Sequence, residues 1–151
     1  MTKKQYEAEI TSHVDKVKEL MRDFINRIVS RSVKHDQLKL ESPEAEVFME
    51  YTPKLANTTY GSEDYYSCLK EMQPALDHHY ANYRHHPEHF ENGISGMTLV
   101  DLVEMFCDWK ASNLRQQNTG FIDSIEQSAK RFHIDDQLKQ ILINTANMGD
   151  E

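Results

Sequence analysis

Cysteine is scarce in this chain of 151 residues, and long apolar runs are lacking. The only two cysteines, Cys68 and Cys107, form no CxxC pattern, which argues against a disulfide scaffold or a zinc ribbon and favours a reducing, cytoplasmic setting. No window approaches the roughly 18 consecutive apolar residues of a membrane span, and no apolar segment opens the chain. We therefore expect neither a transmembrane helix nor a signal peptide.

Positive charge is also in deficit, with 17 Lys and Arg residues against 25 Asp and Glu residues and a net charge of -8. A uniformly acidic field argues against nonspecific binding of nucleic acid and against a membrane partner. It does not exclude a small anionic substrate, because a bound cation can reverse the sign of the field locally. The sequence leaves the oligomeric state open.

Strands with alternating apolar residues are lacking too, and apolar residues recur instead at helical spacing. A stripe with steps of three or four residues predicts a helix over about residues 4–30; it consists of Ile10, Val14, Val17, Met21, Phe24 and Ile28. Thr98 and Asp101 resemble a capping box and predict a helix from Leu99 to about Gln116. Shorter helices are predicted over about 121–132 and 135–146.

Two further helix starts carry sequence signals. Ser42, Pro43 and Glu44 predict a helix that runs to about Leu55, and Ser62 predicts the cap of another. We expect Pro74 to interrupt that second helix or to start the next, which would end near Pro87. The sequence as a whole predicts an all-α fold, a single domain over residues 1–151 with six or seven helices.

Histidine is concentrated in one short stretch. Five of the eight histidines lie between His78 and His89. If this stretch is helical up to Pro87, His78, His85 and His86 lie on one face, where several imidazoles can reach one metal ion. The alternative interpretation is a solvated polar helix that is rich in histidine.

Other metal-ligating side chains are scattered along the chain. His13 lies on the apolar stripe of the first helix, where a hydrogen-bonded core histidine is the alternative. His35 and Asp36 are adjacent and are followed by Lys39; a polar helix start is the alternative there. Three carboxylates share a face of the helix after Thr98, as candidate ligands or as a solvated acidic stripe: Asp101, Glu104 and Asp108.

The order of these residues resembles the HD superfamily of metal-dependent phosphohydrolases, which is all-helical. Its signature is an early His, an adjacent His-Asp pair and a distant Asp. The closest resemblance is to the HD-GYP branch, in which a Lys follows the pair by three residues, a single His and a His-His pair near a Glu come next, and the closing Asp precedes an Ala and an Arg. The corresponding residues are His13, His35-Asp36, Lys39, His78, His85-His86-Pro87-Glu88, Asp108, Ala111 and Arg115.

The chain departs from that branch at one motif, because Asn92-Gly93-Ile94-Ser95-Gly96 stands where the Gly-Tyr-Pro triplet would be. This departure weakens the case for a cyclic dinucleotide as substrate. The whole chain also resembles uncharacterised small proteins of phages and bacteria that share the run His-His-Pro-Glu-His. That second resemblance implies no substrate.

The HD resemblance implies one or two transition metals, namely Mn, Fe, Co, Ni or Zn. The implied ligands, with His79 as the alternative to His78, are His13, His35, Asp36, His78, His85, His86 and Asp108. A carboxylate has two oxygens, so Asp36 is suited to bridge two ions. Lys39 would hold a phosphate, and Asp36 and Glu104 complete the expected catalytic set. Glu104, Glu88 and His89 are candidates to orient metal-bound imidazoles.

The expected reaction is hydrolysis of a phosphomonoester or phosphodiester, in a small anionic substrate such as a nucleotide, by a metal-activated water. Two alternatives stay open. One is an HD-type di-iron oxygenase, which uses the same kind of ligand set. The other is a non-enzymatic phage-type inhibitor or sequestering protein with a structural metal.

Overall fold

Every regular element in the described part of the chain is a helix. The computed structural model describes residues 1–59, 62–116 and 120–149, and over these ranges it contains six α-helices, three short 3-10 helices and no strand. The predicted all-α fold class is therefore confirmed. The chain divides into two compact units, Met1–Lys34 and His35–Glu151. The prediction of a single domain stays a prediction.

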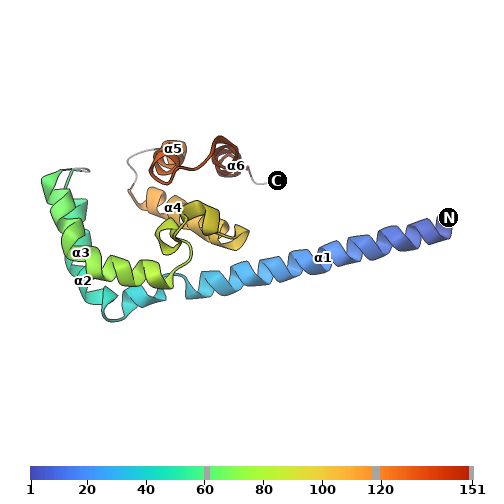
Figure 1. Cartoon of the computed structure of the whole chain (residues 1–151), viewed down its shortest axis with the longest axis horizontal. Helices are drawn as coiled ribbons and strands as arrows, with labels where there is room; N and C mark the ends of the chain where they lie inside the picture. The colour runs from blue at the N-terminus through green and yellow to red at the C-terminus, as the bar shows by residue number, and fades with distance from the viewer. Residues whose placement is uncertain (60–61, 117–119, 150–151) are drawn as a thin grey trace. The chain divides into compact units, whose positions relative to one another are not determined.

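The first unit is one long helix, α1 (Lys3–Lys34), drawn in blue in Figure 1. It contains the predicted helix and extends it at its C-terminal end. Ion pairs one turn apart join charged residues along its surface, among them Lys16 with Glu19 at 2.6 Å and Asp23 with Arg27 at 2.9 Å. None of its residues is buried.

The second unit begins with a short 3-10 helix, η1 (Gln37–Leu40), and the helices α2 (Glu44–Ala56) and α3 (Glu63–Asn82), which pack against each other. Helix α2 begins one residue later than predicted, with Pro43 and not Ser42 at the N-cap position and no side-chain cap. The predicted cap at Ser62 is confirmed, because its hydroxyl accepts from the Tyr65 amide. The expectation that Pro74 interrupts the helix is wrong. Pro74 lies inside a continuous α3, because one missing N–H donor does not prevent the turns on either side from forming.

Helix α3 ends five residues earlier than the sequence predicts. Its last residue is Asn82, and Tyr83 and His86 have extended backbones. The residue before a proline is biased away from the helical region, which explains why His86 is extended before Pro87. Two 3-10 helices follow, η2 (Pro87–His89) and η3 (Gly93–Gly96). His85 and His86 therefore lie in a loop, and the helical spacing that related them to His78 does not apply.

Three helices complete the second unit: α4 (Leu99–Gln116), α5 (Phe121–Arg131) and α6 (Asp136–Ala146). Their predicted positions are confirmed to within a residue at each end. Helix α5 packs against both α4 and α6, and their apolar core is centred on Ile125, Ala129, Ile134 and Leu142. No helix in the described ranges is both long enough and apolar enough to cross a membrane.

A buried carboxylate anchors the loop between α3 and α4. Asp101 accepts from the Thr98 amide at 2.8 Å, which confirms the capping box, and it pairs with Arg84 at 3.0 Å. Its side chain has no exposed surface. Because Arg84 immediately precedes His85 and His86, this ion pair helps to hold the histidine loop against the start of α4.

Candidate metal centre

Asp36 lies in a tight turn between α1 and η1. Its φ of 55° falls in the left-handed region, which Asp tolerates better than most residues. The turn is closed by the Lys39 amide, which donates to the Asp36 carbonyl at 3.0 Å, and by the Leu38 amide, which donates to the Tyr83 hydroxyl at 2.7 Å. The His35-Asp36 pair therefore lies in a turn that the Leu38–Tyr83 hydrogen bond joins to the end of α3.

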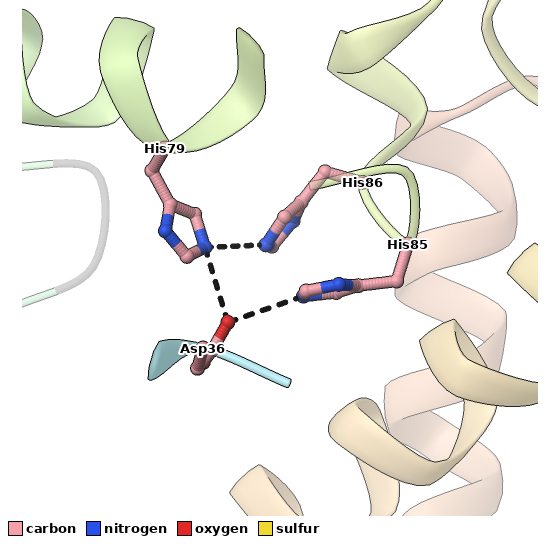
Figure 2. A group of neighbouring side chains, drawn as sticks. All are labelled: Asp36, His79, His85 and His86. Atoms are coloured by element: carbon pink, nitrogen blue, oxygen red, sulfur yellow. Dashed lines mark hydrogen bonds and ion pairs between the residues drawn. The ribbon is translucent and has the colours of Figure 1, made fainter. Parts of the chain in front are cut away.

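Three imidazoles converge on the Asp36 carboxylate (Figure 2). The Nε2 atoms of His79 and His85 lie 3.4 and 3.5 Å from Asp36 Oδ1, and the Nε2 atoms of His79 and His86 are 2.9 Å apart. All four potential ligand atoms lie within 4.8 Å of one another. Neighbouring ligands of a tetrahedral ion with bonds of about 2.0–2.1 Å lie roughly 3.3 Å apart, so this group has the dimensions of a metal site.

Asp36 also belongs to a second group, on the side that faces α4. His35 Nε2 lies 3.5 Å from Asp36 Oδ2 and 3.7 Å from Asp108 Oδ1, and these three side chains could hold an ion. A third combination consists of His35, His85 and Glu104. Glu104 Oε1 lies 3.0 Å from His35 Nδ1 and 3.2 Å from His85 Nδ1, but only the contact with His35 has the geometry of a hydrogen bond.

Glu44 is the residue of this site that the sequence did not reveal. Its carboxylate is fully buried and accepts from His78 Nδ1 and His79 Nδ1, each at 2.8 Å. Protonation of His79 at Nδ1 leaves the lone pair on Nε2, which faces Asp36 and His86. A carboxylate that fixes the tautomer in this way is the usual partner of a metal-bound imidazole. The sequence signal at Glu44 indicates only an acid in the first turn of a helix.

Three buried polar atoms at the centre have no hydrogen-bond partner in the described structure: Asp36 Oδ1 and both ring nitrogens of His85. Each such atom costs on the order of 1–3 kcal/mol when it is left unsatisfied. A cation bound between Asp36 and His85 would satisfy two of the three. The donor set therefore fits a metal better than it fits a closed hydrogen-bond network.

Two histidines of the first group, His79 and His86, have lowered pKa values and are neutral at neutral pH. Burial, together with the proximity of His85 and His79, lowers the pKa of His86 to about 3. Burial also lowers the pKa of His79, with Lys39 adding to the effect. Neutral imidazole is the form that binds a metal, so at neutral pH His79 and His86 need not release a proton before they bind one.

His35 behaves in the opposite way. Its interactions with Asp108 and then Glu104 raise its pKa to about 10, despite partial burial. For Asp108, burial raises the pKa of the carboxyl, but the interaction with His35 and the nearby His85 and His86 outweigh it, and the pKa falls. His35 and Asp108 therefore form an ion pair at neutral pH, and a metal bound there would replace a proton.

Two of the predicted ligands lie outside these three groups. His78 points to Glu44, and the alternative residue His79 takes its place beside Asp36, because the two imidazoles are about 100° apart around α3. His13 is exposed on α1, in the other unit, and belongs to no group of candidate ligands within the described ranges. A ligand role for either residue stays a prediction.

The other predicted residues are placed as follows. Lys39 Nζ lies 2.7 Å from Asp36 Oδ2, and Glu104 is hydrogen-bonded to His35. Glu88 pairs with Arg131 at 2.9 Å, and His89 Nδ1 donates to the Tyr80 carbonyl at 2.7 Å. Glu88 and His89 thus fasten the loop that carries His85 and His86, and neither contacts a candidate ligand through these bonds.

The chain belongs to DUF5662, a family of unknown function whose model matches residues 2–148. No curated protein and no solved structure matches the chain. Membership of this family assigns no activity, and the resemblance to the HD superfamily stays a prediction.

Replacement of Glu44 by Gln should weaken metal binding by about 10–100-fold, because an amide cannot accept from both His78 and His79 as the carboxylate does. Titration with Zn²⁺ or Mn²⁺ by calorimetry measures the effect. Glu46→Gln is the matched control, since Glu46 is exposed on the same helix. Equal affinities in Glu44→Gln and the wild type would show that Glu44 does not orient a ligand.

Proposed function

We propose that this protein is a metal-dependent phosphohydrolase with a centre for two divalent ions bridged by Asp36. The observation that carries the proposal is that the two oxygens of the Asp36 carboxylate face different groups of candidate ligands. Oδ1 faces His79 and His85 at 3.4 and 3.5 Å, whereas Oδ2 faces His35 at 3.5 Å. One oxygen for each group is the arrangement that a bridging ligand requires.

The donor set favours a first-row transition metal. The first group offers three imidazoles and one carboxylate, which suit Mn, Fe, Co, Ni or Zn better than Mg or Ca. When bound, such ions would lower the pKa of a coordinated water and polarise a phosphoryl oxygen. The protein's own contribution is to fix the ligands, through Glu44 behind His79 and Glu104 behind His35.

Lys39 supports an anionic substrate. Its ammonium lies beside Asp36 Oδ2 and 5.4 Å from the centre of the Phe48 ring, and its side chain remains 37% exposed. An ammonium has no lone pair and cannot ligate a metal, but it can bind a phosphate. It would offset the repulsion between a phosphorylated substrate and a chain of net charge -8. The expectation that this substrate is a nucleotide rests only on the resemblance to the HD superfamily.

Asp36→Asn should remove bound metal, because both groups of candidate ligands then lose the carboxylate that they share. Asn tolerates the left-handed backbone of this turn, so this variant separates ligation from folding better than Ala would. Elemental analysis of the purified protein gives the metal content. Asp123→Asn, on the exposed side of α5, is the control that should keep its metal. Equal metal content in Asp36→Asn and the wild type would contradict the proposed centre.

Lys39→Met should reduce phosphatase turnover by at least tenfold and leave metal content unchanged. A panel of phosphomonoesters, phosphodiesters and nucleotides with added Mn²⁺, Co²⁺ or Ni²⁺ measures turnover, and Lys70→Met on the exposed side of α3 is the control. Loss of metal together with activity would make Lys39 structural. Oxygen-dependent turnover of the iron-loaded protein would instead favour the di-iron oxygenase, and bound metal without turnover would favour a structural metal.

The opposite charge states of the two groups predict a proton release on metal binding. His35 carries its proton below about pH 10, so an ion bound by His35, Asp36 and Asp108 displaces about one proton, and its affinity should rise about tenfold per pH unit between pH 7 and 9. Calorimetry in buffers of different ionisation enthalpy counts the protons. His35→Gln should abolish this release. A pH-independent affinity for both ions would exclude His35 as a ligand.

A further inference from the structure

Tyr83 joins the end of α3 to the turn that carries Asp36. Its amide donates to the His79 carbonyl at 3.0 Å, at the point where the helix ends. Its ring lies against two candidate ligands, with its centroid 4.7 Å from that of His79 and 5.6 Å from that of His85. Its hydroxyl accepts from the Leu38 amide at 2.7 Å. Tyr83 therefore contacts the turn, the helix and the loop that carry the first group of candidate ligands.

The Leu38 amide is the donor that an aspartate at the start of a helix usually binds. Asp36 is the N-cap residue of η1, and Leu38 is the second residue of that helix. The side chain of an N-cap Asp commonly accepts from the second or third amide of its helix, because those amides have no partner within the helix. The Asp36 side chain makes no such bond. The hydroxyl of Tyr83 is the acceptor in its place.

This exchange of acceptors leaves the Asp36 carboxylate free for other contacts. Its Oδ1 is buried without a hydrogen bond, although the Leu38 amide belongs to the same turn. The same oxygen faces the Nε2 atoms of His79 and His85 at 3.4 and 3.5 Å. A buried acceptor without a donor lowers the stability of the fold, and a cation bound to it would remove that penalty.

We propose that Tyr83 is a positioning residue whose hydroxyl binds the Leu38 amide and thereby keeps the Asp36 carboxylate free to ligate a metal ion. The inference rests on the proposed metal centre and adds a residue that acts on the ion through Asp36. Without the hydroxyl, the Asp36 carboxylate would accept from the Leu38 amide, as in an ordinary N-cap. That contact would draw it away from the imidazoles.

The first test compares the removal of two hydroxyl groups. Tyr83→Phe keeps the ring against the imidazoles but should weaken Co²⁺ binding about 10–100-fold, which is the usual effect of losing a group that orients a metal ligand. Tyr80→Phe is the matched control, because the Tyr80 ring centroid lies 5.0 Å from that of His86, whereas the Tyr80 hydroxyl interacts with Arg131 of α5. The control should keep the wild-type affinity. Titration followed by the visible absorption of Co²⁺ measures both variants.

Thermal unfolding of the metal-free protein separates positioning from simple stabilisation. With Asp36 present, Tyr83→Phe should change the melting temperature by less than about 1 °C, because the carboxylate replaces the hydroxyl as acceptor. Asp36→Gly tolerates the left-handed turn and has no side chain that could cap η1. In that background Tyr83→Phe should lower the melting temperature by roughly 2–8 °C, because the Leu38 amide loses its acceptor. Circular dichroism of EDTA-treated protein gives the four melting temperatures.

Each measurement has an outcome that would overturn the inference. Equal Co²⁺ affinities in Tyr83→Phe and the wild type would show that the hydroxyl does not position Asp36. The same loss of melting temperature with and without the Asp36 carboxylate would show that the carboxylate does not replace the hydroxyl. A wild type that binds no Co²⁺ would contradict the proposed function, while the melting temperatures would still decide whether Tyr83 and Asp36 compete for the Leu38 amide.

Discussion

The second unit depends on the placement of one carboxylate, that of Asp36. The residue sits in a left-handed turn, and its side chain meets imidazoles from α3 and from the following loop on one side and the α4 acids with His35 on the other. These elements are distant in sequence. Polar contacts join them, because Asp36 and Glu44 contact histidines of α3 and its following loop, and Glu104 of α4 contacts His35.

Such a cluster has to balance its charge. Burying carboxylates is costly unless they are paired and hydrogen-bonded. Glu44 is satisfied by two imidazole donors, while Asp36 and Asp108 face the ammonium of Lys39 and the protonated ring of His35. The balance is incomplete, since Asp36 Oδ1 and the His85 ring are buried without hydrogen bonds. A divalent ion bound between Asp36 Oδ1 and His85 would supply the missing positive charge.

Local patterns predicted the helices well and the centre less well. The capping box of Thr98 and Asp101 and the cap at Ser62 fixed helix starts because their determinants lie within four residues. The choice between His78 and His79 depended on where α3 ends. Helical spacing extended past Asn82 related His85 and His86 to His78, whereas the structure places His79 beside them. Glu44 could not be recognised, because its function comes from contacts with residues more than 30 positions away.

The two halves of the centre are chemically unequal, and under the proposed function this inequality assigns them different tasks. The side with His79, His85 and His86 is rich in nitrogen, and the pKa values of His79 and His86 are lowered, so it would hold an ion firmly at neutral pH. The side with His35 and Asp108 has one imidazole, and that imidazole retains a proton. An ion bound there would compete with the proton and would bind more weakly. Lys39 Nζ lies 2.7 Å from Asp36 Oδ2, the oxygen that also faces His35, so the group that can bind a phosphate contacts the shared carboxylate itself. Under the proposed function, the ion beside His79 and His86 would thus be retained at neutral pH, whereas occupancy of the site at His35 and Asp108 would depend on pH.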